Sequence, residues 1–158
     1  MISFLILSAI GICACAFLDF WQRLLFYIFK VPPPNWALVG RWLIIFLRTR
    51  IWVQSNLVKQ TAIKNELFIG WVFHYFVAVV YALLYLFLVN HNVINFGFAD
   101  GVVFGLFSVI VPWFFFMPAM GTGILANKAP NPSLSCILAL MAHTIFGGAL
   151  GWLFKILY

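Results

Sequence analysis

Four stretches of this chain are apolar over the length that a helix needs to cross a lipid bilayer, and this feature limits its fold more than any other. They cover about residues 2–29, 67–89, 98–120 and 133–154. A helix needs about 20 mostly apolar residues to cross a hydrocarbon core about 30 Å thick. The pattern therefore predicts an all-α polytopic membrane protein, built as a bundle of four transmembrane helices.

The composition agrees with a membrane protein and excludes a water-soluble fold. Hydrophobic residues make up 66% of the 158 residues and charged residues only 8%, whereas soluble domains contain about 45–50% and about 25%. A soluble core of this size has no room for so many apolar side chains. At this length we expect a single membrane domain over residues 1–158.

The basic residues are distributed unevenly between the loops, which predicts an orientation. Seven of the nine lysines and arginines lie between the late part of the first span and the start of the second. Lys128 lies between the third and fourth spans, and the loop 91–97 has no basic residue. Because cytoplasmic loops carry an excess of Lys and Arg, both basic loops are expected in the cytoplasm. Both termini then face the periplasm of a bacterial inner membrane.

The formal net charge of +6 does not predict a nucleic-acid partner. A nucleic-acid-binding surface gathers its basic residues on one face, whereas here they lie in the loops beside membrane spans. The expected partners are the bilayer and the anionic lipid headgroups of its cytoplasmic leaflet. Candidate contacts for a headgroup, or for another anion, are Arg41, Gly121, Gly123 and Lys128.

The first cytoplasmic connection, residues 30–66, is expected to contain a further short helix. Prolines at positions 32–34 end any helix that arrives from the first span, and Asn35 is a favourable N-cap residue for a new one. The predicted helix covers residues 35–47, which is too short to span. It lies either on the inner leaflet as an interfacial helix or within the protein as a re-entrant segment. The sequence leaves both arrangements open.

Ionisable side chains inside the spans are costly there and mark candidate functional positions. His74 and His143 each lie about 12–15 Å from the cytoplasmic end of their spans, at about 1.5 Å per residue. Asp19, in the first span, arrives near the same depth from the opposite side, and Met117 lies late in the third span. These four residues are therefore predicted to form one intramembrane polar site in the cytoplasmic half.

Three kinds of role fit such a site. It can carry protons or handle a substrate, because imidazole titrates near neutral pH. It can bind haem or copper, with His74, His143, Met117 and Met120 as the candidate ligands. It can also act only in helix packing, through hydrogen bonds between the spans. The sequence requires no cofactor, and none is predicted.

Small residues at a spacing of four mark two helix faces for close packing. Gly101 and Gly105 lie on the third span, and Gly147 and Gly151 lie on the fourth. Such spacing lets two helix backbones approach each other closely. The two faces are expected to pack either on each other or on a second copy of the chain. Pro112 and Pro118 are expected to kink the third span.

Several motifs in order resemble the bacterial membrane family known as domain of unknown function 2938. They are Leu38-Val39-Gly40-Arg41-Trp42, Glu66 with Ile69-Gly70-Trp71 and His74-Tyr75, Met117 to Gly123, Asn127 to Pro132, and His143 with Phe146-Gly147. The resemblance covers nearly the whole chain and implies a complete inner-membrane protein, but that family supplies no activity or substrate. The chain departs from the family pattern at Ala78, where a glycine-like position is expected, and in a longer Phe-rich run before Met117.

The sequence leaves three functional hypotheses. The first is a small transporter or a proton-coupled accessory subunit that uses the intramembrane Asp and His residues. The second is a structural or assembly protein in which the same residues only fix helix packing. The third is an intramembrane protein that binds haem or copper or modifies a lipid. No catalytic Ser, His and Asp pattern and no H-E-x-x-H, Walker or dinucleotide motif is present in the sequence, so an enzyme is not the expectation.

Overall fold

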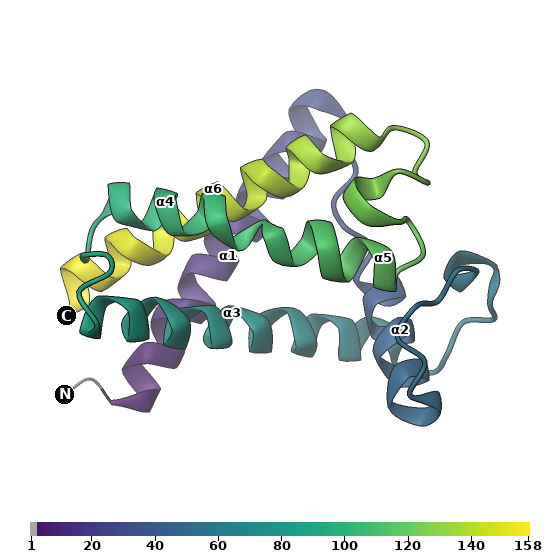
Figure 1. Ribbon diagram of the computed structural model, residues 1–158, viewed down its shortest axis with the longest axis horizontal. Coiled ribbons are helices and arrows are strands. Elements are labelled where there is room, and N and C mark those ends of the chain that lie inside the picture. The colour runs from purple at the N-terminus through teal and green to yellow at the C-terminus, as the bar shows by residue number, and fades with distance from the viewer. Residues whose placement is uncertain (1–2) are drawn as a thin grey trace. The chain divides into compact units, whose positions relative to one another are not determined.

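The computed structural model describes residues 3–158, so Ile2, where the first predicted span begins, lies outside the described residues. Figure 1 labels the helices in chain order. Within the described part, four helices are long and apolar enough to cross a membrane. They are α1 (Phe4–Phe29), α3 (Glu66–Asn90), the helical stretch Phe98–Ala119, and α6 (Pro132–Leu157). The predicted all-α fold with four apolar spans is confirmed.

The short helix of the first connection is also confirmed. It is α2 (Trp36–Thr49), and its N-cap is Asn35, whose side-chain oxygen accepts from the backbone N–H groups of Ala37 and Leu38 at 3.1 and 3.4 Å. These bonds satisfy donors that a helix N-terminus leaves without an intrahelical partner. The cap therefore fixes where α2 begins, directly after the three prolines.

The third span is interrupted at its centre. It consists of α4 (Phe98–Ser108), the π-helical turn η2 (Pro112–Phe116) and the short α5 (Met117–Ala119). Pro112 has no N–H to donate to the carbonyl of Ser108, four residues earlier. That carbonyl accepts instead from the hydroxyl of Tyr81 at 3.4 Å. The α-helix thus ends just before the first of the two prolines for which the sequence predicts a kink, and the π-helical turn begins at that proline.

The chain divides into two compact units, which are described separately here. The first unit comprises the described residues up to Pro33, Tyr75–Ser108 and Leu140–Tyr158. The second unit comprises Pro34–His74 and Val109–Ala139, including the 3-10 turns η1 (Leu57–Lys59) and η3 (Ile124–Ala126). The expectation of a single domain stays a prediction.

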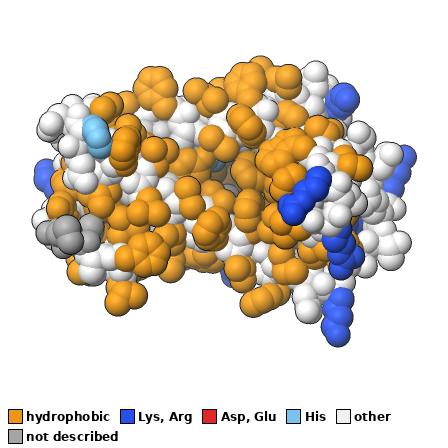
Figure 2. Space-filling model, turned by 60° about the horizontal axis from the view of Figure 1, so that its bottom comes forward, with side chains coloured by type: hydrophobic (Ala, Val, Ile, Leu, Met, Phe, Trp, Pro, Cys, Tyr) orange, Lys and Arg blue, Asp and Glu red, His pale blue; other side chains and the backbone are white. Residues whose placement is uncertain are grey.

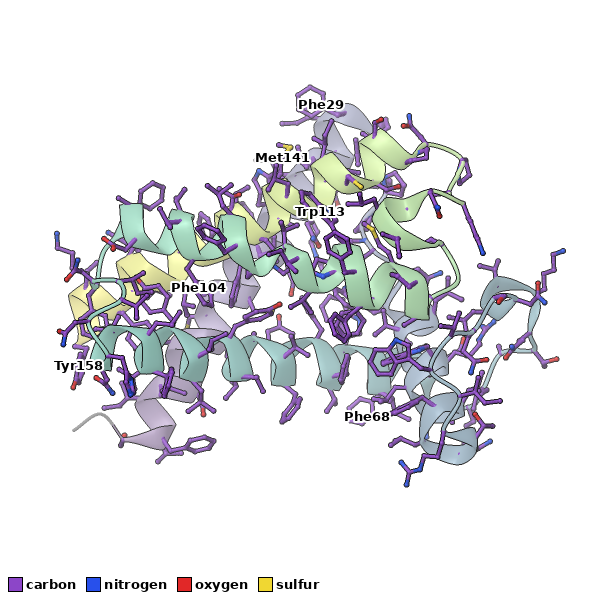
Figure 3. All side chains as sticks on the ribbon, in the orientation of Figure 1. Phe29, Phe68, Phe104, Trp113, Met141 and Tyr158 are labelled. Atoms are coloured by element: carbon purple, nitrogen blue, oxygen red, sulfur yellow. The ribbon has the colours of Figure 1, made fainter. Side chains whose placement is uncertain are left out.

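The core of the first unit is built where small residues of α1 meet small residues of α3. A Cβ atom on Gly11 would lie 2.9 Å from the carbonyl oxygen of Ala78. Ala14 and Ala82 are fully buried beside this contact, and Tyr85 is buried in the same core. Phe104 of α4, labelled in Figure 3, is buried there as well. Ala78, noted above as a departure from the family pattern, therefore still provides a small surface at this contact.

The core of the second unit is centred on Trp42 of α2. Its side chain is 2% exposed, and its indole N–H donates to the carbonyl of Trp52 at 2.8 Å. Leu57 and Ala119 complete the buried set. Aromatic rings contact the indole from several directions, namely those of Phe46, Trp52, Phe73 and Phe116.

Much of the protein surface is apolar. Hydrophobic side chains cover most of the face drawn in Figure 2. Phe68 of α3, labelled in Figure 3, is 69% exposed, and Phe107 of α4 is 70% exposed. Large continuous apolar surfaces are rare on soluble monomers. The exposed surfaces of these helices therefore suit contact with lipid rather than water.

Candidate intramembrane polar site

The carboxylate of Asp19 is a buried charge-bearing group of the first unit. Asp19 lies on α1 and is 7% exposed, and the Tyr75 hydroxyl of α3 donates to its Oδ2 at 2.8 Å. At about 1.5 Å per residue, Asp19 lies about 15 Å along the helix from Phe29, the last residue of α1. The close contact at Gly11 brings α1 near enough to α3 for this bond to form.

A second polar group in the first unit links α4 to α6. Nδ1 of His143 lies 2.8 Å from the hydroxyl of Ser108, and that hydroxyl donates to the carbonyl of Gly105 at 2.9 Å. A serine hydroxyl has a single proton, so while Ser108 donates to Gly105 it accepts from His143. The imidazole then carries its proton on Nδ1, and Nε2 keeps the lone pair.

Glycines set the distance between α4 and α6 at this point. A Cβ on Gly105 would collide with the carbonyl oxygen of His143, and a Cβ on Gly147 would collide with the carbonyl oxygen of Gly101. The Cα of Gly151 likewise lies against Gly101. The two glycine faces that the sequence marks therefore pack on each other within one chain. They are not available to a second copy of the chain.

His74 lies in the second unit, in contact with two tryptophans. Its ring stacks on the indole of Trp36 at a centroid distance of 3.8 Å, and Trp71 meets it edge-on at 5.7 Å. Trp36 is the first residue of α2, so the cap at Asn35 also positions this stack.

The methionines of the second unit occupy different surroundings. The carbonyl of Met117 accepts from both the backbone N–H and the hydroxyl of Thr122, at 2.9 and 2.8 Å. Met120 packs against the Trp42 core. This apolar packing gives Met120 a structural role, whereas copper binding at the two methionines stays a prediction.

The four residues of the predicted polar site divide between the two units. Asp19 and His143 belong to the first unit, where their hydrogen-bond partners are Tyr75 and Ser108. His74 and Met117 belong to the second unit. The sequence alone did not identify Ser108 or assign Tyr75 to Asp19, because a hydroxyl in a span carries no charge that marks it. A single site made of all four residues stays a prediction.

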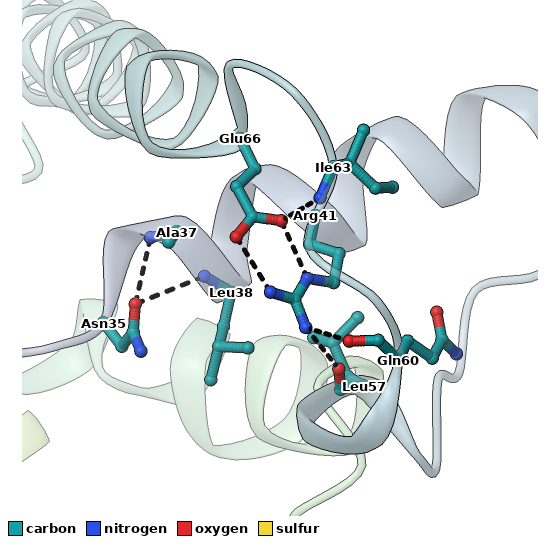
Figure 4. A network of polar contacts seen from close by, with 8 residues as sticks. All are labelled: Asn35, Ala37, Leu38, Arg41, Leu57, Gln60, Ile63 and Glu66. Carbon is teal, nitrogen blue, oxygen red and sulfur yellow. Dashed lines mark hydrogen bonds and ion pairs between the residues drawn. The ribbon is translucent and has the colours of Figure 1, made fainter.

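Arg41 is held by acceptors of the second unit (Figure 4). Its Nε and Nη2 donate to the two carboxylate oxygens of Glu66 at 2.8 Å each, and Nη1 donates to the carbonyls of Leu57 and Gln60 at 3.1 and 2.7 Å. The hydrogen bonds to Glu66 raise the pKa of the guanidinium above its usual value. Glu66 also accepts from the N–H of Ile63 at 2.8 Å. Arg41 thus ties α2, the loop that follows it and the start of α3 together.

The other candidate anion contacts lie in the loop before α6. Gly121 and Gly123 have positive φ angles of 82° and 79°, which glycine adopts without strain. The N–H of Gly121 donates to Pro118, and that of Lys128 donates to Thr122. The side chain of Lys128 is exposed. An anion at this loop stays a prediction, with the lysine side chain as its most accessible contact.

Comparison with known proteins gives a family match. A family model described as protein of unknown function (DUF2938) matches residues 8–155. No curated protein and no solved structure matches this chain. The resemblance drawn from the sequence motifs is confirmed.

Proposed function

Because this chain belongs to the family of proteins of unknown function DUF2938, its activity must be argued from its own residues, and we propose a small transporter or proton-coupled accessory subunit. Its four apolar helices make it a multi-pass membrane protein. The observation that carries the proposal is the buried carboxylate of Asp19 on α1, which accepts a hydrogen bond from the hydroxyl of Tyr75 on α3. In the proposed function, Asp19 takes up and releases the proton.

The surroundings of Asp19 support that role. An ionisable side chain inside a span is expensive to bury and is typical of a substrate or proton pathway. An ionised carboxylate is only an acceptor, and the Tyr75 hydroxyl supplies a donor for it. When Oδ1 of the carboxylate takes up a proton, Oδ2 still accepts the hydrogen bond from Tyr75. The pair can therefore exist in both protonation states without a change of helix packing.

His143 is the second group of the proposed pathway. With its proton on Nδ1, bonded to Ser108, the ring has an Nε2 lone pair that can accept another proton. A proton taken up at Nε2 makes the ring a cation whose Nδ1–H bond to Ser108 remains. Asp19 and His143 are thus two proton-accepting side chains of the first unit, and a hydroxyl contacts each of them.

The orientation and assembly are parts of the same proposal. The basic loops support a bacterial inner-membrane location with both termini in the periplasm, and with the anionic headgroups of the cytoplasmic leaflet as partners of those loops. Four spans enclose few sites for a solitary transporter, so association with a second copy is proposed. Such association has to use faces other than those of Gly101 and Gly147, which pack on each other.

A structural or assembly protein is the second candidate. The observation that favours it is the tight contact of α4 and α6 around the Ser108 and His143 pair. In that function the polar groups serve only to specify which helix faces meet. Removing a hydroxyl or carboxylate would then reduce stability and leave the proton flux through the vesicles unchanged.

Infrared spectroscopy of the protein in proteoliposomes separates these two functions. Protonation of Asp19 gives a carboxylic-acid carbonyl band on lowering the pH, which is expected to disappear in Asp19→Asn and to persist in Asp100→Asn. Asp100 is a suitable control because it lies at the start of α4 and accepts from the N–H of Asn95 at 3.0 Å. Proton flux through the same vesicles, followed with a trapped pH-sensitive dye, is expected to fall in Asp19→Asn.

The thermal unfolding midpoint of each variant shows whether that variant is folded, so that a loss of proton flux is not mistaken for a loss of folding. A folded Asp19→Asn protein with an unchanged infrared band and unchanged proton flux would contradict the proposed function. If Asp19→Asn does not fold, Tyr75→Phe provides the second test, because it removes the hydroxyl that donates to Asp19 and keeps the aromatic ring. In the proton-coupled protein this variant shifts the pH at which the band appears.

A further inference from the structure

The second unit exposes a group of basic side chains that no acidic residue of that unit neutralises. Its exposed basic residues are Arg48, Arg50, Lys59, Lys64 and Lys128. All of its residues are described, and Glu66 is its one acidic residue. Glu66 is already bonded through both carboxylate oxygens to Arg41. The exposed residues therefore present an uncompensated positive charge.

These residues lie in the last turn of α2, in the loop after it and in the loop before α6, and these two loops pack on each other within the second unit. The backbone N–H of Gln54 donates to the carbonyl of Ala119 at 2.9 Å. A Cβ on Gly121 would lie 2.7 Å from the carbonyl oxygen of Gln54, so the chain before Lys128 runs against the chain that follows α2. The basic residues of both loops consequently belong to one folded surface. We call it the basic loop surface.

Large apolar side chains are exposed between these basic residues. Ile51, Val53 and Val58 are 58%, 50% and 75% exposed, and Trp52 is 37% exposed. Basic residues interleaved with exposed aliphatic and aromatic ones are typical of segments that lie in the headgroup region of a bilayer. Exposing the same apolar side chains to water alone would be unfavourable.

We propose that the basic loop surface binds the phosphate headgroups of anionic phospholipids in the leaflet next to it. The lysines and arginines contact the phosphates, and the exposed apolar residues Ile51, Trp52, Val53 and Val58 enter the boundary between headgroups and acyl chains. Arg41 positions this surface through its hydrogen bonds to Glu66, Leu57 and Gln60. The inference deepens one part of the proposed function, the headgroup contacts of the basic loops, and rests on it. It involves neither Asp19 nor His143, so a failed lipid test and a failed proton test are distinguishable.

A nucleic acid or an acidic protein fits this surface less well. Neither partner accounts for the aliphatic side chains beside the charges, whereas a lipid leaflet receives both. The surface is also part of a protein whose helices suit a bilayer. The distribution of basic residues assigns both loops to the cytoplasmic side of the membrane, where anionic headgroups are present.

Native mass spectrometry of the full chain in mild detergent tests the proposal. The protein is titrated with phosphatidylglycerol and with phosphatidylcholine that have identical acyl chains. The expected result is tighter binding of phosphatidylglycerol, by about tenfold or more for several basic contacts, and about fivefold less for each basic residue removed. The triple variant Arg48→Gln, Lys59→Gln, Lys64→Gln is expected to lose most of this preference and to keep only the share of Arg50 and Lys128. Lys155→Gln, an exposed lysine of the first unit, is the matched control and keeps the preference.

Two further measurements are the salt dependence of lipid binding and its competition by inorganic phosphate. The Debye length falls from about 30 Å at 0.01 M salt to about 3 Å at 1 M, so the preference of the unaltered protein is expected to decrease over this range. This measurement also serves if the triple variant does not fold. The proposal is overturned if the unaltered protein binds the two lipids equally, if the preference is independent of salt, or if the folded triple variant retains it in full. Competition by inorganic phosphate as strong as that by the lipid would assign the surface to free anions and equally overturn it.

Discussion

Gly101 of α4 lies against Gly147 of α6 so closely that a Cβ atom on either residue would collide with the carbonyl oxygen of the other. Each helix therefore contacts the backbone of its neighbour directly over this stretch. The neighbouring pair of Gly105 with the His143 backbone continues the contact. Close backbone approach of this kind gains van der Waals packing, which drives helix association in lipid.

Substituting Gly147 by alanine is expected to separate α4 from α6. The added methyl group has only backbone atoms of Gly101 and Gly105 to displace, so the cost of overpacking, about 1–3 kcal/mol or more, exceeds the gain in helix propensity of about 1 kcal/mol. The free energy of unfolding, measured by titration with denaturing detergent in mixed micelles, should decrease. Val103→Leu adds a methylene at an exposed position of α4 and is expected to leave it unchanged. Equal stability of both variants would contradict the packing described.

Substituting Arg41 by glutamine is expected to loosen the loop between α2 and α3. Glu66 loses both of its guanidinium donors, and the carbonyls of Leu57 and Gln60 lose theirs. We expect faster limited proteolysis within residues 50–65 and a lower thermal unfolding midpoint. Arg48→Gln is the control, because Arg48 is exposed in the last turn of the same helix.

The pair of Arg41 and Glu66 is also expected to withstand alkaline conditions. A raised pKa means that the arginine contributes stability fully below its usual pKa, and that this contribution is lost only as the pH rises through the higher folded value. Arginine is already charged at any pH below about 12. The protease sensitivity of residues 50–65 should therefore be the same at neutral pH and at about pH 9. A marked increase at the higher pH would show that another group controls the loop.

Substituting Trp42 by phenylalanine is expected to destabilise the second unit by about 2 kcal/mol. The change removes the donor to the Trp52 carbonyl, for which a lost partner costs about 1–3 kcal/mol, and leaves space in a buried aromatic cluster. The free energy of unfolding in mixed micelles measures the effect. Trp152→Phe, at a side chain that is 54% exposed, is expected to have little effect. A loss of similar size in both variants would indicate that aromatic content in general, and not this bond, determines stability.

Substituting Ser108 by alanine is expected to destabilise the contact of α4 with α6 by about 1–3 kcal/mol. His143 loses the hydroxyl that its Nδ1 contacts at 2.8 Å, and a buried polar group without a partner carries the desolvation cost. Ser133→Ala, at an exposed serine in the first turn of α6, is the matched control. Thermal unfolding of the two variants side by side provides the comparison. An unaltered Ser108→Ala midpoint would mean that His143 finds another partner.

The span lengths could be predicted because they follow from apolar runs and local end signals. Asn35 begins α2, and the charged Glu66 begins α3, where the sequence pattern changes. The π-helical turn could be predicted only as a kink, because Pro112 removes one N–H but does not determine how neighbouring residues accommodate the loss. The sequence also left open whether the two glycine faces pack on each other or on a second copy of the chain, and the structure was needed to decide this.

The polar site was less accessible to sequence reasoning. Charge and depth identified Asp19 and His143, but the hydroxyls that bind them depend on the rotation of each helix about its axis. A helix position turns by about 100° per residue, so an uncertainty of one residue in packing moves a hydroxyl to another face. Arg41 was expected to be available to anions, and its binding to Glu66 depends on how α2 folds back on α3. Contacts between distant segments were therefore the part that the sequence could not provide.

The contact of α4 with α6 also restricts the routes by which anything can cross the membrane. Between Gly101 and Gly147 the two backbones meet directly, with no side chain whose rotation could open a gap. A water molecule, an ion or a lipid tail has no passage along this seam. Any permeation pathway, and any gate that controls it, must therefore run along other helix faces.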